Sequence, residues 1–364
     1  MIARERLPRI GILPSGGRDA ITDVAGVTVG HCTLDEGEVQ TGVTVIRPHA
    51  GDPFRDRVPA AVSVINGFGK SVGLMQVEEL GALETPIALT NTFSVAAVAQ
   101  AQIRHCIAAN PGSGRNLPTV NPLVFECNDG YLNDIQRMAV TAGHYDRACE
   151  VAGIGVEEGS VGAGRGMSCF GVKGGIGTAS RRVATRGGGE FIVGTLVLAN
   201  HGRTTQLVMA GRAIGDRLAA LLARKAAPPR EGPEKGSIIM LVATDAPLDA
   251  RQLRRLALRA GAGLARTGSV FGHGSGDIAL AFSTAWTLPQ DADRPMPAQA
   301  MLHDTLLDTL FQAAADGTEQ AIVHALWRAC PVTGRNGNHR RGLSDLLADW
   351  PPPPEPTTSC ASPA

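Results

Sequence analysis

The chain has 364 residues, with 34 basic and 34 acidic side chains and a formal net charge of zero. At roughly 100–200 residues per domain, this length permits one large domain or two small ones, and it suffices for a sizeable core. A neutral chain without clustered positive charge lacks the electrostatic footprint of a nucleic-acid or membrane-surface binder. No apolar run approaches the ~18–20 residues of a spanning helix. We therefore expect no nucleic-acid partner and no membrane segment.

The first residues and the cysteines indicate the compartment. Residues 1–17 carry several charged side chains and no apolar stretch of the kind found in signal peptides, which predicts a cytoplasmic protein. The seven cysteines are an odd number without C-x-x-C spacing. This argues against a disulfide framework or a zinc ribbon and predicts small buried apolar side chains.

The first half of the chain is predicted to hold short strands and one clear helix. β-Branched residues between glycines over 20–47 predict a β-rich opening. Glycines recur between 153 and 189 too often for a helix and predict turns and closely packed backbone. The remaining expected elements are strands at Ala60–Ile65 and Pro86–Leu89, a helix at Thr92–Ala108, and a strand at Leu123–Cys127 that ends at the turn Asn128-Asp129-Gly130.

A sharp change of composition follows in the second half. Phe191–Ala199 predicts a strand that ends at Asn200, and apolar residues from Leu207 at helical spacing predict a helix that stops near Lys225. Residues 226–236 contain three prolines, two glycines and four charged residues, which is typical of an exposed linker. Ser237–Thr244 is an apolar run of strand length. An exposed linker is therefore expected to run directly into a buried strand.

The last third predicts more helix than strand. Asp249 is a candidate cap for a helix that continues through Leu264, and a turn over Gly274–Asp277 precedes a strand at Ile278–Ser283. Two further helices are expected at Leu306–Ala314 and Glu319–Ala329, before a disordered proline-rich tail over 350–364. Strands and helices interleave irregularly, which favours layered α/β architecture over a regular βαβ wheel.

Three familiar motifs fail at a required position. Gly69-Lys70-Ser71 resembles a phosphate loop, but Val64 stands where that loop needs glycine. The glycines over 162–166 have the wrong interval for a dinucleotide fingerprint. Ser275 has His273 where a nucleophile elbow needs glycine. The sequence therefore favours neither a nucleotide site nor an α/β-hydrolase serine.

Gly236-Ser237 carries more chemical information. Cleavage between these residues would leave Ser237 with a free α-amino group at the tip of a rigid strand. A serine hydroxyl is a weak nucleophile without an adjacent base, and an amino-terminal amine, with a pKa near ~7.7–8.0, is such a base at neutral pH. From the residues alone, an ordinary linker remains the alternative.

Several longer stretches together resemble one family, the self-processing serine aminopeptidases that include L-aminopeptidase/D-alanine esterase-amidase and the β-peptidyl aminopeptidases. In their order they cover roughly residues 10–345. The matching stretches lie at 20–31, 84–92, 126–134, 162–178, 236–239, 243–247 and 274–278.

The resemblance implies a fold and a maturation step. The fold would be a four-layer αββα sandwich of the N-terminal-nucleophile type, in which an amino-terminal residue made by cleavage acts as nucleophile. Self-cleavage between Gly236 and Ser237 would give an α chain of residues 1–236 and a β chain of residues 237–364 that stay together. The resemblance also implies a homo-oligomer of αβ units, with no metal and no organic cofactor.

The resemblance further implies a set of site residues. Ser237 would attack the carbonyl of the substrate's first residue, and either its own α-amine or the pair Ser275 and Asp277 would accept the proton. The side-chain amide of Asn200 would stabilise the oxyanion, and Glu126 would bind the substrate's ammonium group. The substrate would be a small peptide or amide with a free amino terminus.

One position departs from the family pattern. Asn128 stands at a substrate-binding position where some relatives carry an aromatic residue, and it offers neither the same wall nor a phenol. Tyr131, three residues further on, is a candidate to supply the hydroxyl, and the residue that fills this role stays open. The preference among β-amino acyl, L-alanyl and D-alanyl substrates stays open on the sequence. A processed but non-catalytic small-molecule-binding protein of the same fold is the alternative function.

Overall fold

The computed structural model describes residues 7–185, 189–223 and 236–348. The expected linker, apart from Gly236, and the expected tail therefore lie outside the described residues. Of the helices in the described part of the chain, none combines the length and apolar character needed to cross a bilayer.

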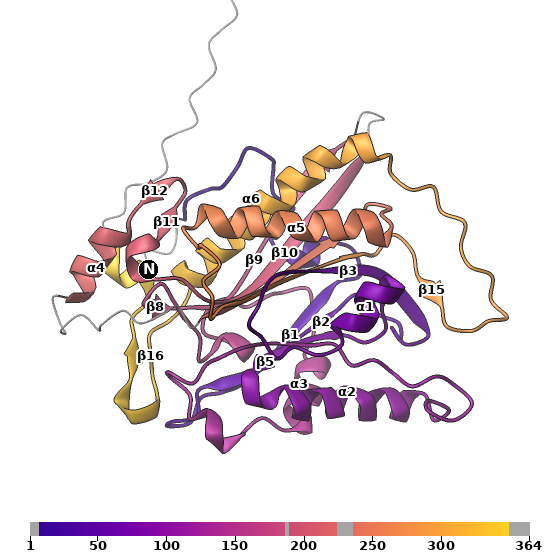
Figure 1. Ribbon diagram of the computed structural model, residues 1–364, viewed down its shortest axis with the longest axis horizontal. Helices are drawn as coiled ribbons and strands as arrows, with labels where there is room; N and C mark the ends of the chain where they lie inside the picture. Colours follow the sequence, from indigo (N-terminus) through magenta and orange to yellow (C-terminus); the bar gives the residue numbers. More distant parts are fainter. Residues whose placement is uncertain (1–6, 186–188, 224–235, 349–364) are drawn as a thin grey trace, which may run out of the picture.

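Two β-sheets form the centre of the molecule (Figure 1). The larger has the strand order β15-β3-β14-β13-β10-β9, with β4 paired to β3, and the smaller has the order β1-β2-β5-β6. The larger sheet consists of β3 (Asp56–Gly67), β4 (Ala82–Leu83), β9 (Gly175–Ala184), β10 (Glu190–Asn200), β13 (Ser237–Thr244), β14 (Gly276–Ser283) and β15 (Leu288–Pro289). The smaller consists of β1 (Thr28–Leu34), β2 (Thr41–Arg47), β5 (Ile87–Asn91) and β6 (Val124–Cys127).

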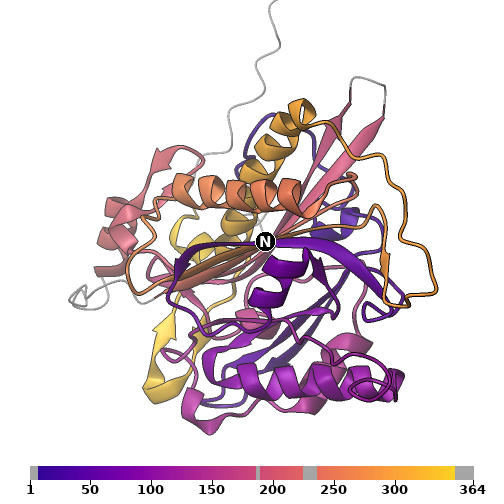
Figure 2. The same ribbon diagram turned by 45° about the vertical axis from the view of Figure 1, so that its right-hand side comes forward.

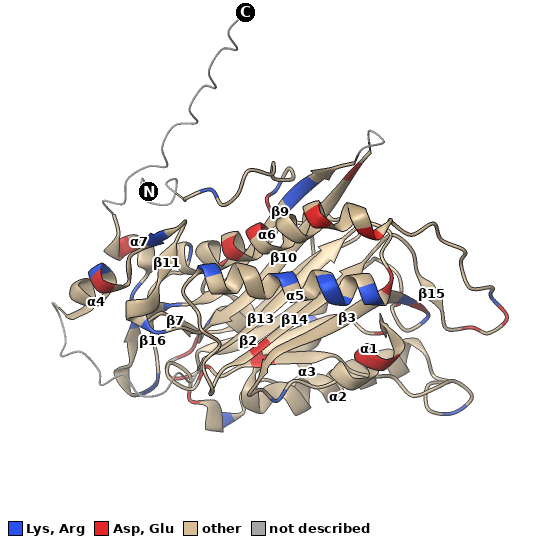
Figure 3. Cartoon of the chain, turned by 45° about the horizontal axis from the view of Figure 1, so that its top comes forward, with Lys and Arg blue, Asp and Glu red and all other residues tan. Residues whose placement is uncertain are grey.

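Helices cover the outer face of each sheet. In Figures 1 and 2, α5 and α6 lie on the outer side of the larger sheet, and α2 and α3 lie below the smaller one. Arginines gather along the outward face of α5 (Figure 3). The opposite face packs into the core against the sheet through Leu253, Leu256, Ala257, Ala260 and Leu264. The α-helices are α1 (Leu74–Leu80), α2 (Val95–Ala109), α3 (Ala142–Glu150), α4 (Gly215–Ala223), α5 (Ala250–Arg266), α6 (Leu307–Trp327) and α7 (Leu343–Leu346).

Three hydrophobic cores separate these four layers. One lies between α5, α6 and the larger sheet, a second lies between the two sheets, and a third lies between the smaller sheet and the pair α2 and α3. Because three buried cores require four layers, the predicted αββα sandwich is confirmed.

Strand β13 is the buried centre of the larger sheet. It pairs antiparallel with β10 and parallel with β14, and all eight of its residues are buried. Ile238 and Met240 face the helix-side core, whereas Ile239 and Leu241 face the core between the sheets. A strand buried on both faces has an almost continuous apolar sequence, which explains the run after Ser237.

The structure corrects three expected boundaries. The two predicted carboxy-terminal helices are one helix, α6, because Gly317 does not break it: a Cβ there would lie 3.0 Å from the Thr195 side chain, so glycine permits close packing on the sheet. The helix predicted from Leu207 begins only at Gly215, after the hairpin of β11 (Val208–Met209) and β12 (Arg212–Ala213). Asp277 lies inside β14 and not in a turn before it.

Candidate active site

Strand pairing aligns three residues at one end of the larger sheet. Two of them are predicted site residues, and the third lies between two others. Asn200 is the last residue of β10, Ser237 is the first of β13, and Gly276 is the first of β14. Asn200 is the register partner of Ser237 on one side, and Gly276 is its partner on the other. Residues far apart in the chain therefore meet at one end of the larger sheet.

Ser237 is held with its hydroxyl beside a backbone donor. The Gly276 N–H donates to Ser237 Oγ at 3.1 Å, and the serine is 5% exposed. The preceding Gly236 packs on the end of β10, where a Cβ would lie 2.4 Å from the Asn200 carbonyl oxygen and 2.6 Å from the His201 Cα. Only glycine fits immediately before this serine.

Ser275 and Asp277 are hydrogen-bonded to each other. The Ser275 hydroxyl donates to Asp277 Oδ1 at 2.6 Å, and both residues are fully buried. Side chains alternate along a strand, so Ser237 shares the face of Ile239 toward the inter-sheet core. Asp277, one residue before Ile278 of the same core, faces the opposite side. The pair thus flanks Ser237 from the helix side of the sheet.

Asn200 is fixed by two backbone contacts. Its Oδ1 accepts the Ser168 N–H at 2.8 Å, and its Nδ2 donates to the Asn128 carbonyl at 3.0 Å. A primary amide has two N–H donors. Among the described residues, these contacts orient the amide and use one of its two N–H donors.

Asn128 and Tyr131 occupy the loop below Asn200. The Asn128 side chain is exposed and accepts the Gly130 N–H at 2.9 Å, so this residue meets Asn200 through its carbonyl and not its side chain. The Tyr131 ring is 40% exposed and lies against Arg340, whose guanidinium carbon is 3.7 Å from the ring centroid.

Glu126 is buried with both carboxylate oxygens bound. Oε1 accepts the Lys70 N–H at 2.8 Å, and Oε2 accepts the Thr92 hydroxyl. A Cβ on Gly69 would lie 3.5 Å from Glu126 Oε1 and 3.9 Å from the Gly276 Cα. The turn at Gly69 therefore bridges the carboxylate and the strand next to Ser237.

A buried lysine organises the segment that supports Asn200. Lys173 Nζ donates to the carbonyls of Gly164, Met167 and Gly174 at 2.8–2.9 Å, and complete burial holds the pKa of its ammonium well below the usual range. These bonds draw a glycine-rich loop around one side chain. Ser168, the donor to Asn200, lies within that loop.

Some residues that contact the predicted site residues are not themselves predicted from the sequence. Thr92 and Ser168 lie inside the matching stretches but act through contacts that no residue pattern marks. The Gly69-Lys70 pair, which does not fit the phosphate-loop pattern, lies in a turn that touches Glu126. Within the described residues, no group of three or more His, Cys, Asp or Glu side chains is arranged to hold a metal ion.

Comparison with known proteins agrees with this arrangement. The model of peptidase family S58 matches residues 19–340. The chain is 40% identical over 341 residues to the beta-peptidyl aminopeptidase BapA of Sphingosinicella microcystinivorans, covering 88% of this chain and 84% of that protein.

Two solved structures extend the similarity to the fold. The beta-aminopeptidase of a Burkholderia species is 43% identical with a TM-score of 0.84, covering 94% of this chain and 95% of that one. The L-aminopeptidase D-Ala-esterase/amidase of Ochrobactrum anthropi, a prototype serine aminopeptidase with a variant Ntn-hydrolase fold, is 36% identical with a TM-score of 0.85, covering 94% and 96%.

The fold is that of the N-terminal-nucleophile type of hydrolase. The chain belongs to peptidase family S58. It is a serine peptidase of the aminopeptidase class.

Asp129 gives the site loop a titratable group near neutrality. Burial raises the pKa of its carboxyl to about 7, although hydrogen bonds from Thr41 and Asn133 oppose the shift. Between the ordinary value of 3.8 and about 7, the folded state binds a proton that the unfolded state has lost. Rising pH therefore lowers the free energy of unfolding by up to about 1.4 kcal/mol per pH unit.

Asp129→Asn should remove this dependence because the amide does not titrate. We expect the urea midpoint of the variant, relative to that of the wild type, to rise steadily from pH 4 to pH 7. Asp308→Asn, on the exposed face of α6, is the matched control and should give a constant difference. A constant difference for Asp129→Asn as well would show that the carboxyl is ionised in the folded protein across this range.

Proposed function

We propose that the protein processes itself between Gly236 and Ser237 and then releases amino-terminal β-amino acyl or small alanyl residues from peptides and amides. The observation that carries this proposal is the convergence of Ser237, Asn200 and Glu126 around the start of one buried strand. The serine supplies a nucleophile, the amide an oxyanion donor, and the carboxylate a partner for an ammonium group.

Self-processing needs only groups at this strand end. Ser237 Oγ attacks the Gly236 carbonyl carbon, the peptide C–N bond breaks, and the hydroxyl proton passes to the departing nitrogen. This gives an ester between Gly236 and Ser237 Oγ and a free α-amine. Water then hydrolyses the ester, which restores the hydroxyl and leaves residues 1–236 and 237–364 as two chains. The close packing of Gly236 on Asn200 supports a constrained, attackable peptide bond.

Turnover of a substrate repeats the same attack on a second carbonyl. Glu126 binds the substrate ammonium, because a buried cation needs a counter-charge. Ser237 Oγ attacks the carbonyl of the first residue, and the second side-chain N–H of Asn200 stabilises the oxyanion. The leaving amine takes a proton and departs, and water hydrolyses the acyl-enzyme.

The face of the sheet on which each side chain lies indicates which group accepts the proton of the Ser237 hydroxyl. The Ser237 hydroxyl and the Ser275–Asp277 pair lie on opposite faces of the sheet. This supports the α-amine of Ser237 as the base that accepts the hydroxyl proton. Ser275 and Asp277 then act on that amine from the other face, keeping it oriented and stabilising its protonated form.

The remaining expectations stay part of the proposal. A homo-oligomer of αβ units and a cytoplasmic location are inferred from the family resemblance and the composition of the first residues. The alternative function is a processed binding protein without turnover. Such a protein would not require the fixed orientation of the Asn200 side-chain amide. The geometry therefore favours the enzyme.

Replacing the nucleophile tests self-processing directly. Ser237→Ala should migrate as one full-length chain on a denaturing gel, because no hydroxyl remains to attack Gly236. Wild type should give two chains, the smaller beginning Ser-Ile-Ile-Met. Ser269→Ala, a second buried serine outside the site, should process normally. Cleavage of Ser237→Ala at the same bond would assign the cut to an outside protease.

Asn200 is tested by two variants that separate its donor from its acceptor. Asn200→Ala and Asn200→Asp should each lower kcat/KM by ~10²-fold or more, as loss of one oxyanion donor typically does. The aspartate keeps an oxygen for the Ser168 N–H, so folding should be preserved. Near wild-type turnover of an alanyl p-nitroanilide by Asn200→Asp would remove this amide from the oxyanion site.

Glu126 is tested by the charge of the substrate. Wild type should hydrolyse free-amine alanyl p-nitroanilide far faster than its N-acetylated form, and Glu126→Gln should weaken chiefly the free-amine reaction, because the amide loses the counter-charge. Glu84→Gln, a buried acid that accepts the Asn121 N–H at 2.6 Å, is the control and should keep the preference. Equal rates on both substrates in wild type would contradict aminopeptidase specificity.

A further inference from the structure

A second charged residue, Arg340, stands beside the site without a partner of opposite charge among the described residues. Arg340 lies on β17 (His339–Arg340), which pairs with β16 (Val332–Thr333) in a hairpin at the same end of the molecule as β8 (Val172–Lys173) (Figure 1). Its Nε donates to Ser168 Oγ at 3.3 Å, and its guanidinium stacks on the Tyr131 ring. Both neighbours are uncharged.

The charge of Arg340 is uncompensated and partly buried. Burial lowers the pKa of its guanidinium, and Tyr131 is the neighbour that opposes this shift. Among the described residues, no carboxylate lies within 4.0 Å of it, whereas the buried Arg181 pairs with Asp19 at 3.2 Å and Arg266 pairs with Asp316 at 2.6 Å. Arginine stays protonated in proteins. A desolvated cation without a counter-ion is costly, so this position suits an anion that arrives with a ligand.

The hairpin holds this cation in a fixed place. Asn338 Nδ2 donates to the Tyr131 carbonyl at 2.8 Å, and the Arg335 N–H donates to the Leu132 carbonyl at 2.7 Å. These bonds fasten the hairpin to the loop whose Asn128 carbonyl binds Asn200. The guanidinium is therefore held beside Ser168, whose N–H donates to the proposed oxyanion residue Asn200.

The two charges lie on opposite sides of Ser237. Glu126 reaches the serine through Gly69 and Gly276 on the β14 side. Arg340 reaches it through Ser168 and Asn200 on the β10 side. A substrate whose ammonium binds Glu126 and whose carbonyl meets Ser237 extends its leaving portion toward the β10 side.

We propose that Arg340 binds the free carboxylate of a short peptide substrate, so that the enzyme prefers dipeptides to the corresponding peptide amides. This inference rests on the proposed function and adds the chemistry of the leaving portion. The planar fork of arginine matches a carboxylate through two parallel hydrogen bonds. Tyr131, predicted as a substrate-binding residue, then serves as the platform that orients the guanidinium.

The test compares two substrates within each enzyme. Wild type should hydrolyse β-alanyl-L-alanine with a kcat/KM at least ~10-fold above that for β-alanyl-L-alaninamide, because charge-assisted hydrogen bonds are stronger than neutral ones. Arg340→Met should bring this ratio near one, and Arg340→Lys should keep part of it. Because each ratio is taken within one enzyme, a general loss of structure cancels.

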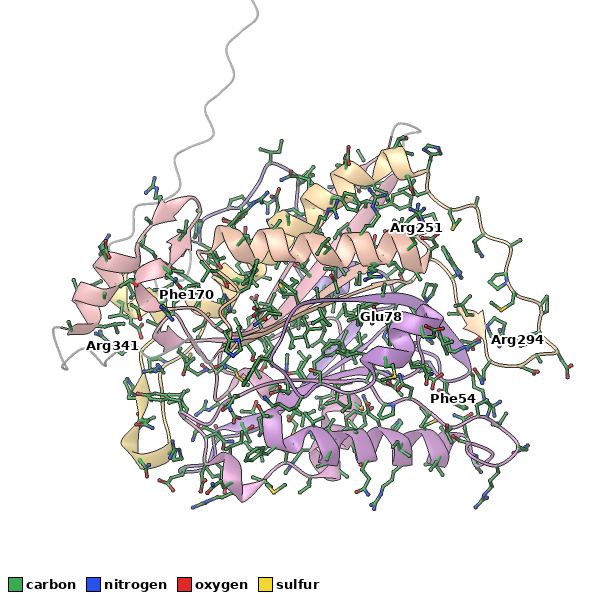
Figure 4. All side chains as sticks on the ribbon, in the orientation of Figure 1. Phe54, Glu78, Phe170, Arg251, Arg294 and Arg341 are labelled. Carbon is green, nitrogen blue, oxygen red and sulfur yellow. The ribbon has the colours of Figure 1, made fainter. Side chains whose placement is uncertain are left out.

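Arg341→Met is the matched control. Arg341 is the next residue in the chain, lies at the left-hand end of the molecule in Figure 4, and offers only its carbonyl to Lys173. This variant makes the same change of charge and should keep the wild-type ratio.

Two results would overturn the proposal. Equal kcat/KM for acid and amide in wild type would do so without any variant, and so would an unchanged ratio in Arg340→Met. If wild type turned over neither peptide and no alanyl p-nitroanilide, the aminopeptidase function itself would fail, and this inference would fail with it.

Discussion

The site depends on one constraint, the register of three neighbouring strands. Asn200, Ser237 and Gly276 are aligned by backbone hydrogen bonds along β10, β13 and β14. A slip of one residue would turn every side chain of β13 to the other face of the sheet. Such a slip is unfavourable because both faces of β13 carry apolar residues, and each face packs into its own core. The sandwich thus fixes the position of Ser237 through buried surface.

The chemistry around that strand end is largely supplied by backbone groups. Gly276 presents an N–H to the serine, Ser168 presents one to Asn200, and Lys70 presents one to Glu126. Backbone donors cost little reorganisation, because the loops that carry them are already fixed. Lys173 performs that fixing for the glycine-rich loop, with its ammonium bound to three carbonyls. The many glycines of this segment allow its backbone to approach the strand ends closely.

Charge arrangement gives the site a direction. A buried carboxylate on one side of Ser237 and a partly buried guanidinium on the other match the two ends of a short peptide with free termini. In this account, the hairpin of β16 and β17 belongs to the site because it carries Arg340 and clamps the loop below Asn200. The same loop carries Asp129, whose titration near neutrality links the stability of this region to pH.

The sequence predicts this architecture unevenly, for physical reasons. The apolar run after Ser237 predicts a buried strand because both faces must be apolar, and Asp249 does cap α5. Residue patterns indicate only mixed α/β structure, and the four layers follow from the family resemblance. The break expected between Ala314 and Glu319 is wrong because a glycine inside a helix can serve packing as well as termination. The sequence predicts neither Ser168 nor Arg340 as a site residue, because their roles arise from tertiary contacts of a loop and a hairpin. Such contacts leave no periodic signal in the sequence.

In the proposed reaction, the hydroxyl of Ser237, at the start of β13, carries the acyl group during turnover. The direct measurement is acid quenching of the enzyme during turnover of a β-alanyl ester, followed by mass spectrometry of peptides. We expect a β-alanyl group on the peptide that begins with Ser237, held there as an ester at the acid pH of the quench. An acyl group found on any other residue, or an unmodified Ser237 peptide under conditions of steady turnover, would contradict it.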